Sequence, residues 1–232
     1  MRESSAAGRR RDGRPAGIVF DNDGLLLDTE PCWTRAQQAV FARRGRVFDL
    51  AAKQALVGTS PQTAAAVLER LLDAPGRGRE LADEMYADAL VEISHGANPR
   101  PHALELLRAA SRVLPLAVAS NAPRSHLLAG LRRTGLGNAF DAVLGVDDVE
   151  NPKPSPDLYL RACELLGVPP AKVVALEDSP PGVAAARAAG LLVVGVPSVE
   201  GVELAADVVA PSLGDPRVRA ALGLDTAEEP PA

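Results

Sequence analysis

The sequence predicts an α/β fold, a doubly wound parallel sheet with an inserted all-helical cap. Short, wholly apolar runs that end in Asp, Ser, Asn, Glu or Gly are typical of buried parallel strands. Helix-length amphipathic stretches lie between these runs, and this alternation favours a parallel sheet with right-handed crossovers. The alternation stops between residues 28 and 99, where only helix-length stretches occur. These observations separate a sheet-based core from a helical insert.

The predicted core consists of the following elements in chain order. Five apolar runs are predicted as strands: 17–20, 114–119, 142–144, 172–176 and 191–196. Four amphipathic stretches are predicted as helices: 102–112, 125–134, 156–166 and 181–189. Together they assign residues 16–28 and 99–224 to the core.

The insert, residues 29–98, is predicted to be all helical. Its expected helices are 33–44, 61–72 and 80–93, and the polar stretch 95–101 is expected to form the hinge that returns to the core. Ligands of open parallel sheets bind outside the carboxyl ends of the strands, and the insert leaves from that edge. We therefore expect it to cap a binding site. The remaining residues, 1–15 and 225–232, are predicted to be disordered tails.

Composition excludes several classes of protein. With 232 residues, 47% hydrophobic residues and 24% charged residues, the chain is typical of a soluble globular protein. Its net charge of −5 gives no electrostatic reason to bind nucleic acid. It has no apolar run long enough for a membrane span, and its arginine-rich start is not typical of a signal peptide. With Cys32 and Cys163 expected to be packed thiols, we expect a cytoplasmic protein. The sequence does not indicate an oligomeric state.

Polar side chains follow the predicted strands where these end. The residues concerned are Asp21, Asn22 and Asp23 after the first strand, Ser120 and Asn121 after the second, Lys153 in a proline-rich segment, and Glu177 and Asp178 after the fourth. Because the carboxyl ends of parallel strands meet at one edge, we expect these groups to converge. Lys153 is one of only three lysines, so a compact ammonium is expected to matter there.

This set of side chains suits phosphoryl transfer to a carboxylate. Carboxylates crowded at one edge repel each other unless a divalent cation lies among them, and their hard oxygen ligands favour Mg²⁺. A carboxylate can attack phosphorus, while a lysine and a hydroxyl hold the charge of the transferring group. A second Asp two residues on can protonate the leaving oxygen.

The motifs Phe-Asp-x-Asp-Gly, Lys-Pro-x-Pro-Asp and Glu-Asp-Ser-x-x-Gly, with Ser120 between the first two, resemble those of the haloacid dehalogenase (HAD) superfamily. The insert is similar to the type-one cap of its β-phosphoglucomutase-like group of phosphatases. The resemblance implies a HAD-like Rossmannoid core and assigns roles to seven residues. Asp21 is implied as nucleophile and Mg²⁺ ligand, and Asp23 as general acid/base and metal ligand through its carbonyl.

The other implied roles concern phosphate and metal. Ser120, the amide of Asn121, and Lys153 are implied to hold the phosphoryl group. Asp178 is implied as a metal ligand, with Glu177 binding directly or through water. Asn22 departs from the family, which usually has an apolar residue at this position.

The expected function is Mg²⁺-dependent hydrolysis of a small phosphorylated metabolite, with a sugar phosphate as the expected class. A phosphomutase is the alternative, but Trp33 and Pro61 stand where the mutase has a histidine and an arginine. A non-catalytic phospho-acceptor or binding domain is a third possibility. In the cap, Trp33, Thr59 and Ser60 are candidate substrate contacts, although Trp33 could equally pack the first cap helix.

Overall fold

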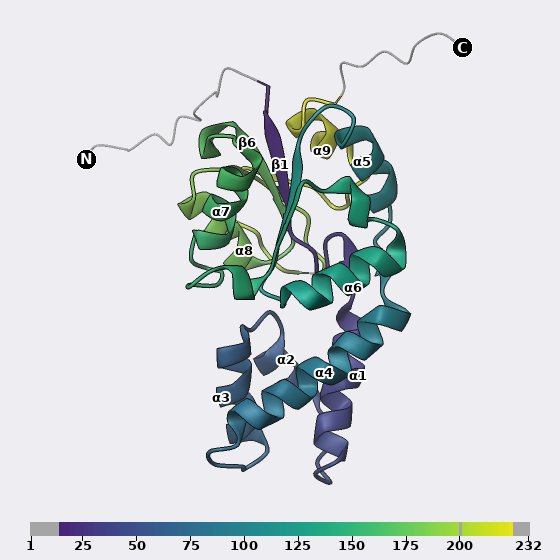
Figure 1. The fold of residues 1–232 in the computed structure, drawn as a ribbon, viewed down its shortest axis with the longest axis vertical. Coiled ribbons are helices and arrows are strands. Elements are labelled where there is room, and N and C mark those ends of the chain that lie inside the picture. Colours follow the sequence, from purple (N-terminus) through teal and green to yellow (C-terminus); the bar gives the residue numbers. More distant parts are fainter. Residues whose placement is uncertain (1–13, 200, 225–232) are drawn as a thin grey trace, which may run out of the picture.

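The computed structural model of the chain describes residues 14–199 and 201–224, so nearly all of the two predicted tails lies outside the described residues. Its main sheet has six strands in the order β5–β4–β1–β6–β7–β8, and all neighbours are parallel. The strands are β1 (Gly17–Phe20), β4 (Leu116–Ala119), β5 (Ala142–Leu144), β6 (Val173–Glu177), β7 (Leu192–Gly195) and β8 (Val208–Val209). The predicted parallel sheet is therefore confirmed (Figure 1).

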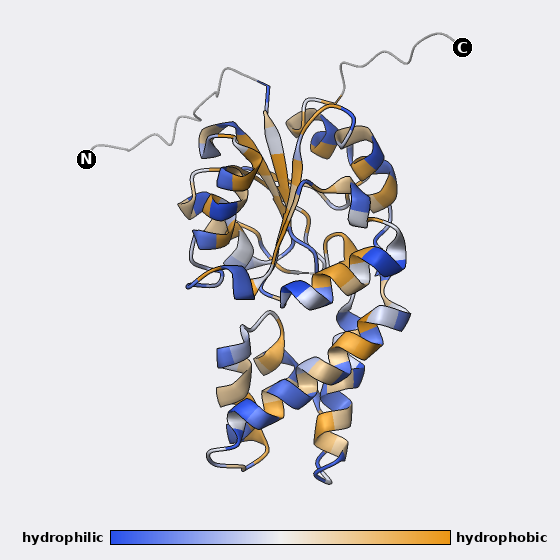
Figure 2. Ribbon diagram, viewed as in Figure 1, coloured by the Kyte–Doolittle hydropathy of each residue, from blue (hydrophilic) through white to orange (hydrophobic). Residues whose placement is uncertain are grey.

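The alternation of side chains along each strand builds two apolar layers, one on each face of the sheet. In β1, Ile18 and Phe20 belong to one buried cluster and Val19 to the other. The first cluster is covered by α5 (Ala103–Ala110), α6 (Arg124–Thr134) and α9 (Pro216–Ala221). The second is covered by α7 (Asp157–Leu166) and α8 (Pro180–Ala188). Figure 2 shows the apolar strands lying between these helical layers, which is the doubly wound arrangement.

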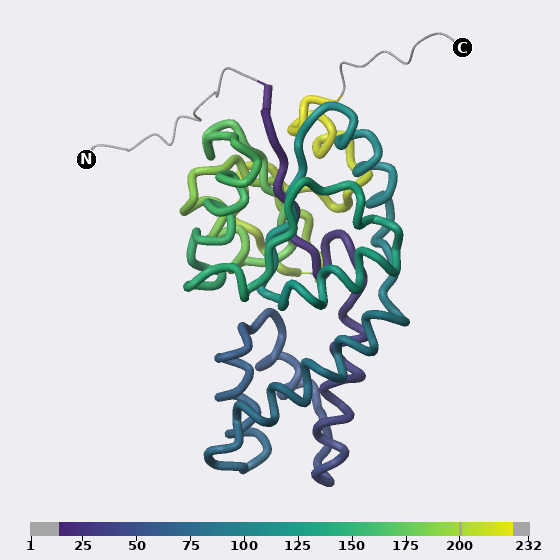
Figure 3. The backbone as a smooth tube through the Cα atoms, in the orientation of Figure 1, coloured from purple at the N-terminus to yellow at the C-terminus, as the bar shows by residue number. Residues whose placement is uncertain are grey.

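The cap consists of four helices between two short strands. The helices are α1 (Glu30–Ala42), α2 (Leu50–Leu56), α3 (Pro61–Leu71) and α4 (Gly78–Gly96), and the strands are β2 (Leu27–Asp28) and β3 (Asn98–Pro99). These strands pair antiparallel, so the chain leaves and re-enters the core side by side. Figure 3 traces this path from β1 down into the cap and back along α4. The cap has its own apolar cluster, in which Val40 and Phe41 of α1 pack with Leu68 and Met85.

The structure adds elements that the sequence did not predict. Helix α2 has only seven residues and two buried side chains, Ala52 and Leu56, which is too few to show a helical hydrophobic pattern in the sequence. The side chain of Asp49 caps this helix by accepting a hydrogen bond from the amide of Ala52. The edge strand β8 has two residues, and α9 has six. The predicted strand 172–176 is shifted by one residue, so that Glu177 ends β6 instead of following it. None of the described helices is both long enough and apolar enough to cross a membrane.

Candidate active site

Lys153 links the ends of three core strands. Its Nζ donates to Asp21 Oδ1 at 2.7 Å, to Ala119 O at 2.8 Å and to Glu177 Oε1 at 2.5 Å. Asp21 directly follows β1, Ala119 ends β4 and Glu177 ends β6, and these strands are neighbours in the sheet. The three donors of the ammonium thus meet three acceptors in a buried position. Lys153 is therefore fixed by the sheet itself.

Asn121 fixes the backbone of this lysine. Its side-chain oxygen accepts from the Lys153 amide at 2.8 Å, and its side-chain nitrogen donates to the Lys153 carbonyl at 3.1 Å. This two-way pairing joins the loop after β4 to the proline-rich segment before α7. The side chain of Asn121 therefore positions Lys153, which the sequence did not predict.

Asp23 is held from both sides of its carboxylate. Its Oδ1 accepts from Thr29 Oγ1 at 2.6 Å and from Trp33 Nε1 at 3.3 Å, and its Oδ2 accepts from Ser120 Oγ at 3.1 Å. Ser120 belongs to the core, whereas Trp33 belongs to α1 of the cap. Asp23 is thus the carboxylate at which the core and the cap meet.

Three carboxylates form a group that could hold a metal ion. One oxygen from each of Asp21, Glu177 and Asp178 lies within 4.8 Å of the others. Both oxygens of Glu177 already accept hydrogen bonds: Oε1 from Lys153 and Tyr159, and Oε2 from Ser179 Oγ at 3.1 Å. The side chain of Asp23 does not belong to this group.

The electrostatics of the group favour an added cation. Burial raises the pKa of Asp21 well above its ordinary value, although Lys153 opposes this. Burial, and then the charge of Glu177, raise the pKa of Asp178 to about 7. Burial alone lowers the pKa of Lys153, but the charges of Asp21 and Glu177 raise it above its usual range. The ionised carboxylates therefore lack compensating charge, and a divalent cation with hard oxygen ligands fits here.

Two glycines let the carboxylates approach the backbone. A Cβ at Gly24, whose φ is +82°, would lie 2.2 Å from Asp178 Oδ2. A Cβ at Gly182 would lie 2.0 Å from the carboxylate of Glu177. Both glycines stand in the motifs that the sequence analysis identified, and the structure gives their physical reason: a side chain there would displace an acidic group.

The predicted cap residues divide into two kinds. Trp33 reaches Asp23 and stacks on His126, with ring centroids 5.6 Å apart and planes at 4°. Thr59 donates to Leu56 O at 2.8 Å, and Ser60 caps α3 by accepting from the Thr63 amide at 3.3 Å. No hydrogen bond or ion pair among the described residues joins Thr59 or Ser60 to the carboxylates. The turn that carries them faces the core in Figure 1.

Several residues that contact the predicted site residues were not predicted from the sequence. Tyr159 donates to Glu177 Oε1 at 2.5 Å and places its ring 5.0 Å from Lys153 Nζ. His126 of α6 is buried and pairs with the carbonyl of Tyr86 in α4 at 2.8 Å. Thr29 is the first residue of the predicted insert, so its place at the boundary between core and cap was a usable signal. Tyr159 and His126 had none, because only tertiary packing brings them to the site.

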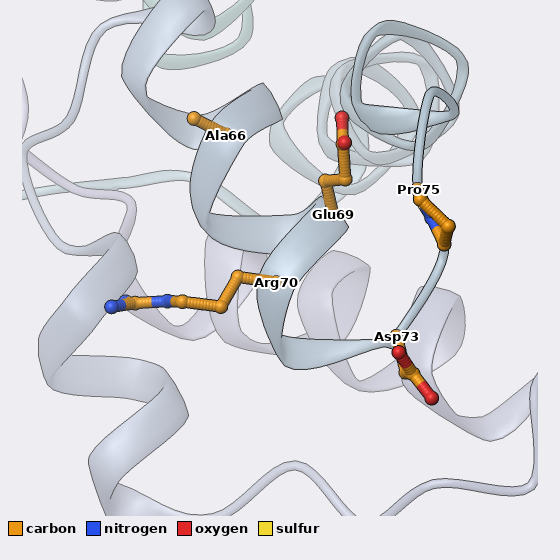
Figure 4. Close-up of a pocket in the computed structure, with 5 residues that line it drawn as sticks. All are labelled: Ala66, Glu69, Arg70, Asp73 and Pro75. Carbon is orange, nitrogen blue, oxygen red and sulfur yellow. The ribbon is translucent and has the colours of Figure 1, made fainter.

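A depression on α3 and the turn after it, shown in Figure 4, contains none of the predicted site residues. Its lining residues are Ala66, Glu69, Arg70, Asp73 and Pro75. Glu69 accepts from the amides of Gly76 and Gly78, at 2.9 Å and 3.2 Å, so its carboxylate stabilises the turn. Figure 4 shows Arg70 and Asp73 pointing away from each other. Nothing in this arrangement competes with the carboxylate group as a catalytic site.

Comparison with known proteins shows the family of this chain. The family model described as haloacid dehalogenase-like hydrolase matches residues 15–190. The fructose-1-phosphate phosphatase YqaB of Escherichia coli is 33% identical over 178 residues, which cover 77% of this chain and 94% of the relative. The phosphorylated carbohydrates phosphatase of Thermotoga maritima is 32% identical over 177 residues, which cover 75% of this chain and 81% of the relative.

A solved structure extends the comparison to three dimensions. The crystal structure of CbbY from Rhodobacter sphaeroides in complex with phosphate matches with a TM-score of 0.78 and 30% identity, and the match covers 90% of this chain and 99% of CbbY. The fold, the ordered motifs and these relatives lead to one assignment. The chain belongs to the haloacid dehalogenase-like hydrolase family, in its β-phosphoglucomutase-like group, and is a phosphoric monoester hydrolase.

Proposed function

We propose that this chain is a Mg²⁺-dependent phosphatase that hydrolyses a small phosphorylated metabolite, a sugar phosphate, through an aspartyl phosphate on Asp21. The observation that carries the proposal is the contact of Asp21 with Lys153, 2.7 Å apart, within a group of three carboxylates at the strand ends. A nucleophile, a cation for phosphate and a metal-binding group lie at one edge of the sheet. The sugar phosphatases among the relatives support the substrate class.

The chemistry divides between Asp21 and Asp23. An oxygen of Asp21 attacks phosphorus, the ester bond breaks, and Asp23 gives a proton to the leaving alcohol. Water then attacks the aspartyl phosphate while Asp23 takes a proton from it, which releases phosphate and restores Asp21. The three donors on Asp23 hold its carboxylate where both proton transfers take place.

The remaining core residues handle charge. We assign the phosphoryl oxygens to Ser120, to the amide of Asn121 and to the positive charge of Lys153, whose ammonium is already held beside Asp21. Mg²⁺ would be held by Asp21, Asp178, Glu177 and the carbonyl of Asp23. When bound, it offsets the negative charge of the carboxylates and of the transferring group.

We further propose that residues 29–98 act as a cap that closes over the site and excludes water until the aspartyl phosphate has formed. Trp33 contacts Asp23, and the α2–α3 turn that carries Thr59 and Ser60 faces the core. Pro61 opens α3 and offers no charged group for a second phosphate, so hydrolysis is favoured over mutase chemistry. The two buried free thiols fit a reducing, cytoplasmic compartment.

The test is phosphate release from a panel of sugar phosphates, phosphoglycolate and nucleotides, with Mg²⁺ and with a chelator. We expect chelator-sensitive release from one or a few sugar phosphates. Absence of release from every member by folded protein would contradict the phosphatase assignment. Interconversion of two sugar phosphates without phosphate release would support the mutase instead.

A further inference from the structure

Buried side-chain oxygens without a hydrogen-bond partner are concentrated in one short segment. In the part of the chain that the structure describes, four such atoms occur, all between residues 22 and 37. One is Oδ1 of Asn22, in the loop between the two catalytic aspartates. The other three are Glu30 Oε1, Thr34 Oγ1 and Gln37 Oε1, and all belong to α1. Random imperfections of packing would be spread over the whole fold.

The three α1 residues share one face of the helix. Positions 30, 34 and 37 are spaced by four and three residues, which places their side chains along one stripe. Trp33 lies on the same stripe, and its Nε1 is 3.3 Å from Asp23 Oδ1. The stripe therefore starts beside the proposed general acid. From residue 30 to residue 37 it extends about 10 Å along the helix axis.

Burial of these oxygens is costly for the folded protein. An unpaired buried acceptor destabilises the folded state, and Gln37 is only 3% exposed. Elsewhere on α1 the buried positions are apolar, as at Ala36, Val40 and Phe41. An apolar residue at 37 would serve packing better. The glutamine is therefore explained best by a ligand that brings hydrogen-bond donors.

A charged pair borders the stripe. Nζ of Lys53, on α2, lies 3.1 Å from Oε1 of Glu30, although the pair lacks hydrogen-bond geometry. Lys53 is the only lysine in residues 29–98. The ammonium of Lys53 adds a hydrogen-bond donor to a surface that otherwise offers acceptors. A ligand hydroxyl group can accept from this donor and donate to those acceptors.

We propose that Thr34 and Gln37 bind the hydroxyl groups of the substrate's leaving group, with Glu30 and Lys53 at the border of this site. The inference rests on the proposed function and adds residues to it: these side chains would bind the hydroxyl groups that distinguish a sugar phosphate from other phosphate esters. A site built to pair with hydroxyls discriminates against analogues that lack them, because its buried acceptors are then left unpaired. An aryl phosphate is expected to be hydrolysed without using this stripe.

The test compares two substrates and three variants. Gln37→Leu and Thr34→Val remove the acceptors at similar side-chain volume, and Gln38→Leu is the matched control, because Gln38 is an exposed neighbour on the same helix. For the best sugar phosphate, we expect kcat/KM of the two test variants to fall about tenfold, mostly through KM. For p-nitrophenyl phosphate, we expect a change of less than about twofold. Gln38→Leu should behave as wild type on both substrates.

Stability gives a second readout. Because Gln37→Leu removes an unpaired polar group, its melting temperature should equal or exceed that of wild type. Equal losses on both substrates, no loss on the sugar phosphate, or a clear drop in melting temperature would overturn the inference. If wild type hydrolyses neither substrate, the proposed function itself fails. If it hydrolyses both and the variants do not discriminate, only this inference fails.

Discussion

The carboxyl edge of the core sheet and the inner face of α1 are both buried and polar, but they are built in opposite ways. At the core edge the polar groups find protein partners: Lys153 has three acceptors and Asp23 has three donors. On α1, Thr34 and Gln37 keep buried oxygens without hydrogen-bond partners, and Glu30 Oε1 has only the ion pair with Lys53. Under the proposed function, the groups that would act on the phosphoryl group are positioned in advance by the fold. The groups that would meet the variable part of the substrate are left to be paired by it.

The largest effect is expected at the nucleophile. Asp21→Asn should reduce phosphate release at least about a thousandfold, because an amide cannot form the aspartyl phosphate. Its melting temperature should stay near that of wild type, since Lys153 keeps Glu177 and the Ala119 carbonyl as partners. Assays of phosphate release and thermal unfolding on the same preparation check this. Residual turnover near the wild-type rate would show that Asp21 is not the nucleophile.

Because Lys153 forms ion pairs with two buried carboxylates, its replacement is expected to cause a large loss of stability. Lys153→Met leaves the buried carboxylates of Asp21 and Glu177 without their cation, and we expect the free energy of unfolding to fall by about 3 kcal/mol. Denaturant unfolding measures this, with Gln37→Leu as the contrast from the unpaired stripe. Equal stability of the two variants would contradict the proposed difference between the paired core edge and the unpaired stripe of α1.

Metal and pH should act together on stability. The pKa of Asp178 lies at about 7 in the folded chain, against an ordinary value of 3.8. In the presence of a chelator, this group contributes stability that is fully present below the lower value and is lost as the pH rises through the higher one. Mg²⁺ binds the ionised form, so it should raise the melting temperature more at about pH 8 than at about pH 5.

Thermal scans with Mg²⁺ and with a chelator across this range provide the measurement. The Asp178→Asn variant is the control, because it removes the titrating group and should flatten the difference between the two ends of the range. A shift with Mg²⁺ that is the same at both pH values in wild type would contradict a metal site at these carboxylates.

The smallest effect is expected at Trp33, which connects the two regions. Trp33→Phe removes one of the three donors on Asp23 but keeps an aromatic ring against His126, so kcat for the sugar phosphate should fall only about threefold. Trp33→Ala, which also loses the ring stack with His126 and the edge contact with Tyr86, should cost more. A Phe variant as impaired as the Ala variant would assign the whole effect to the indole N–H.

Much of the architecture could be predicted because it depends on local pattern. Strands 17–20 and 142–144 were predicted with the observed bounds, since each is a short continuous apolar run, although only the first is buried throughout. The polar residues at the strand ends were predicted to converge, because the edge of a parallel sheet brings them together. Helix α2 and strand β8 were not predicted, because two to seven residues carry too little periodicity.

The sequence by itself determined the order of the motifs, the sheet-based core and the chemistry available at its edge, because these follow from residue type and spacing along the chain. Only the tertiary structure decided that Asn121 holds the backbone of Lys153, that Tyr159 supports Glu177 and that Trp33 stacks on His126. These contacts join residues 18 to 93 positions apart, and no local pattern encodes such a pairing. The unpaired oxygens of α1 also depend on tertiary structure, because a polar residue is unsatisfied only once its surroundings are known.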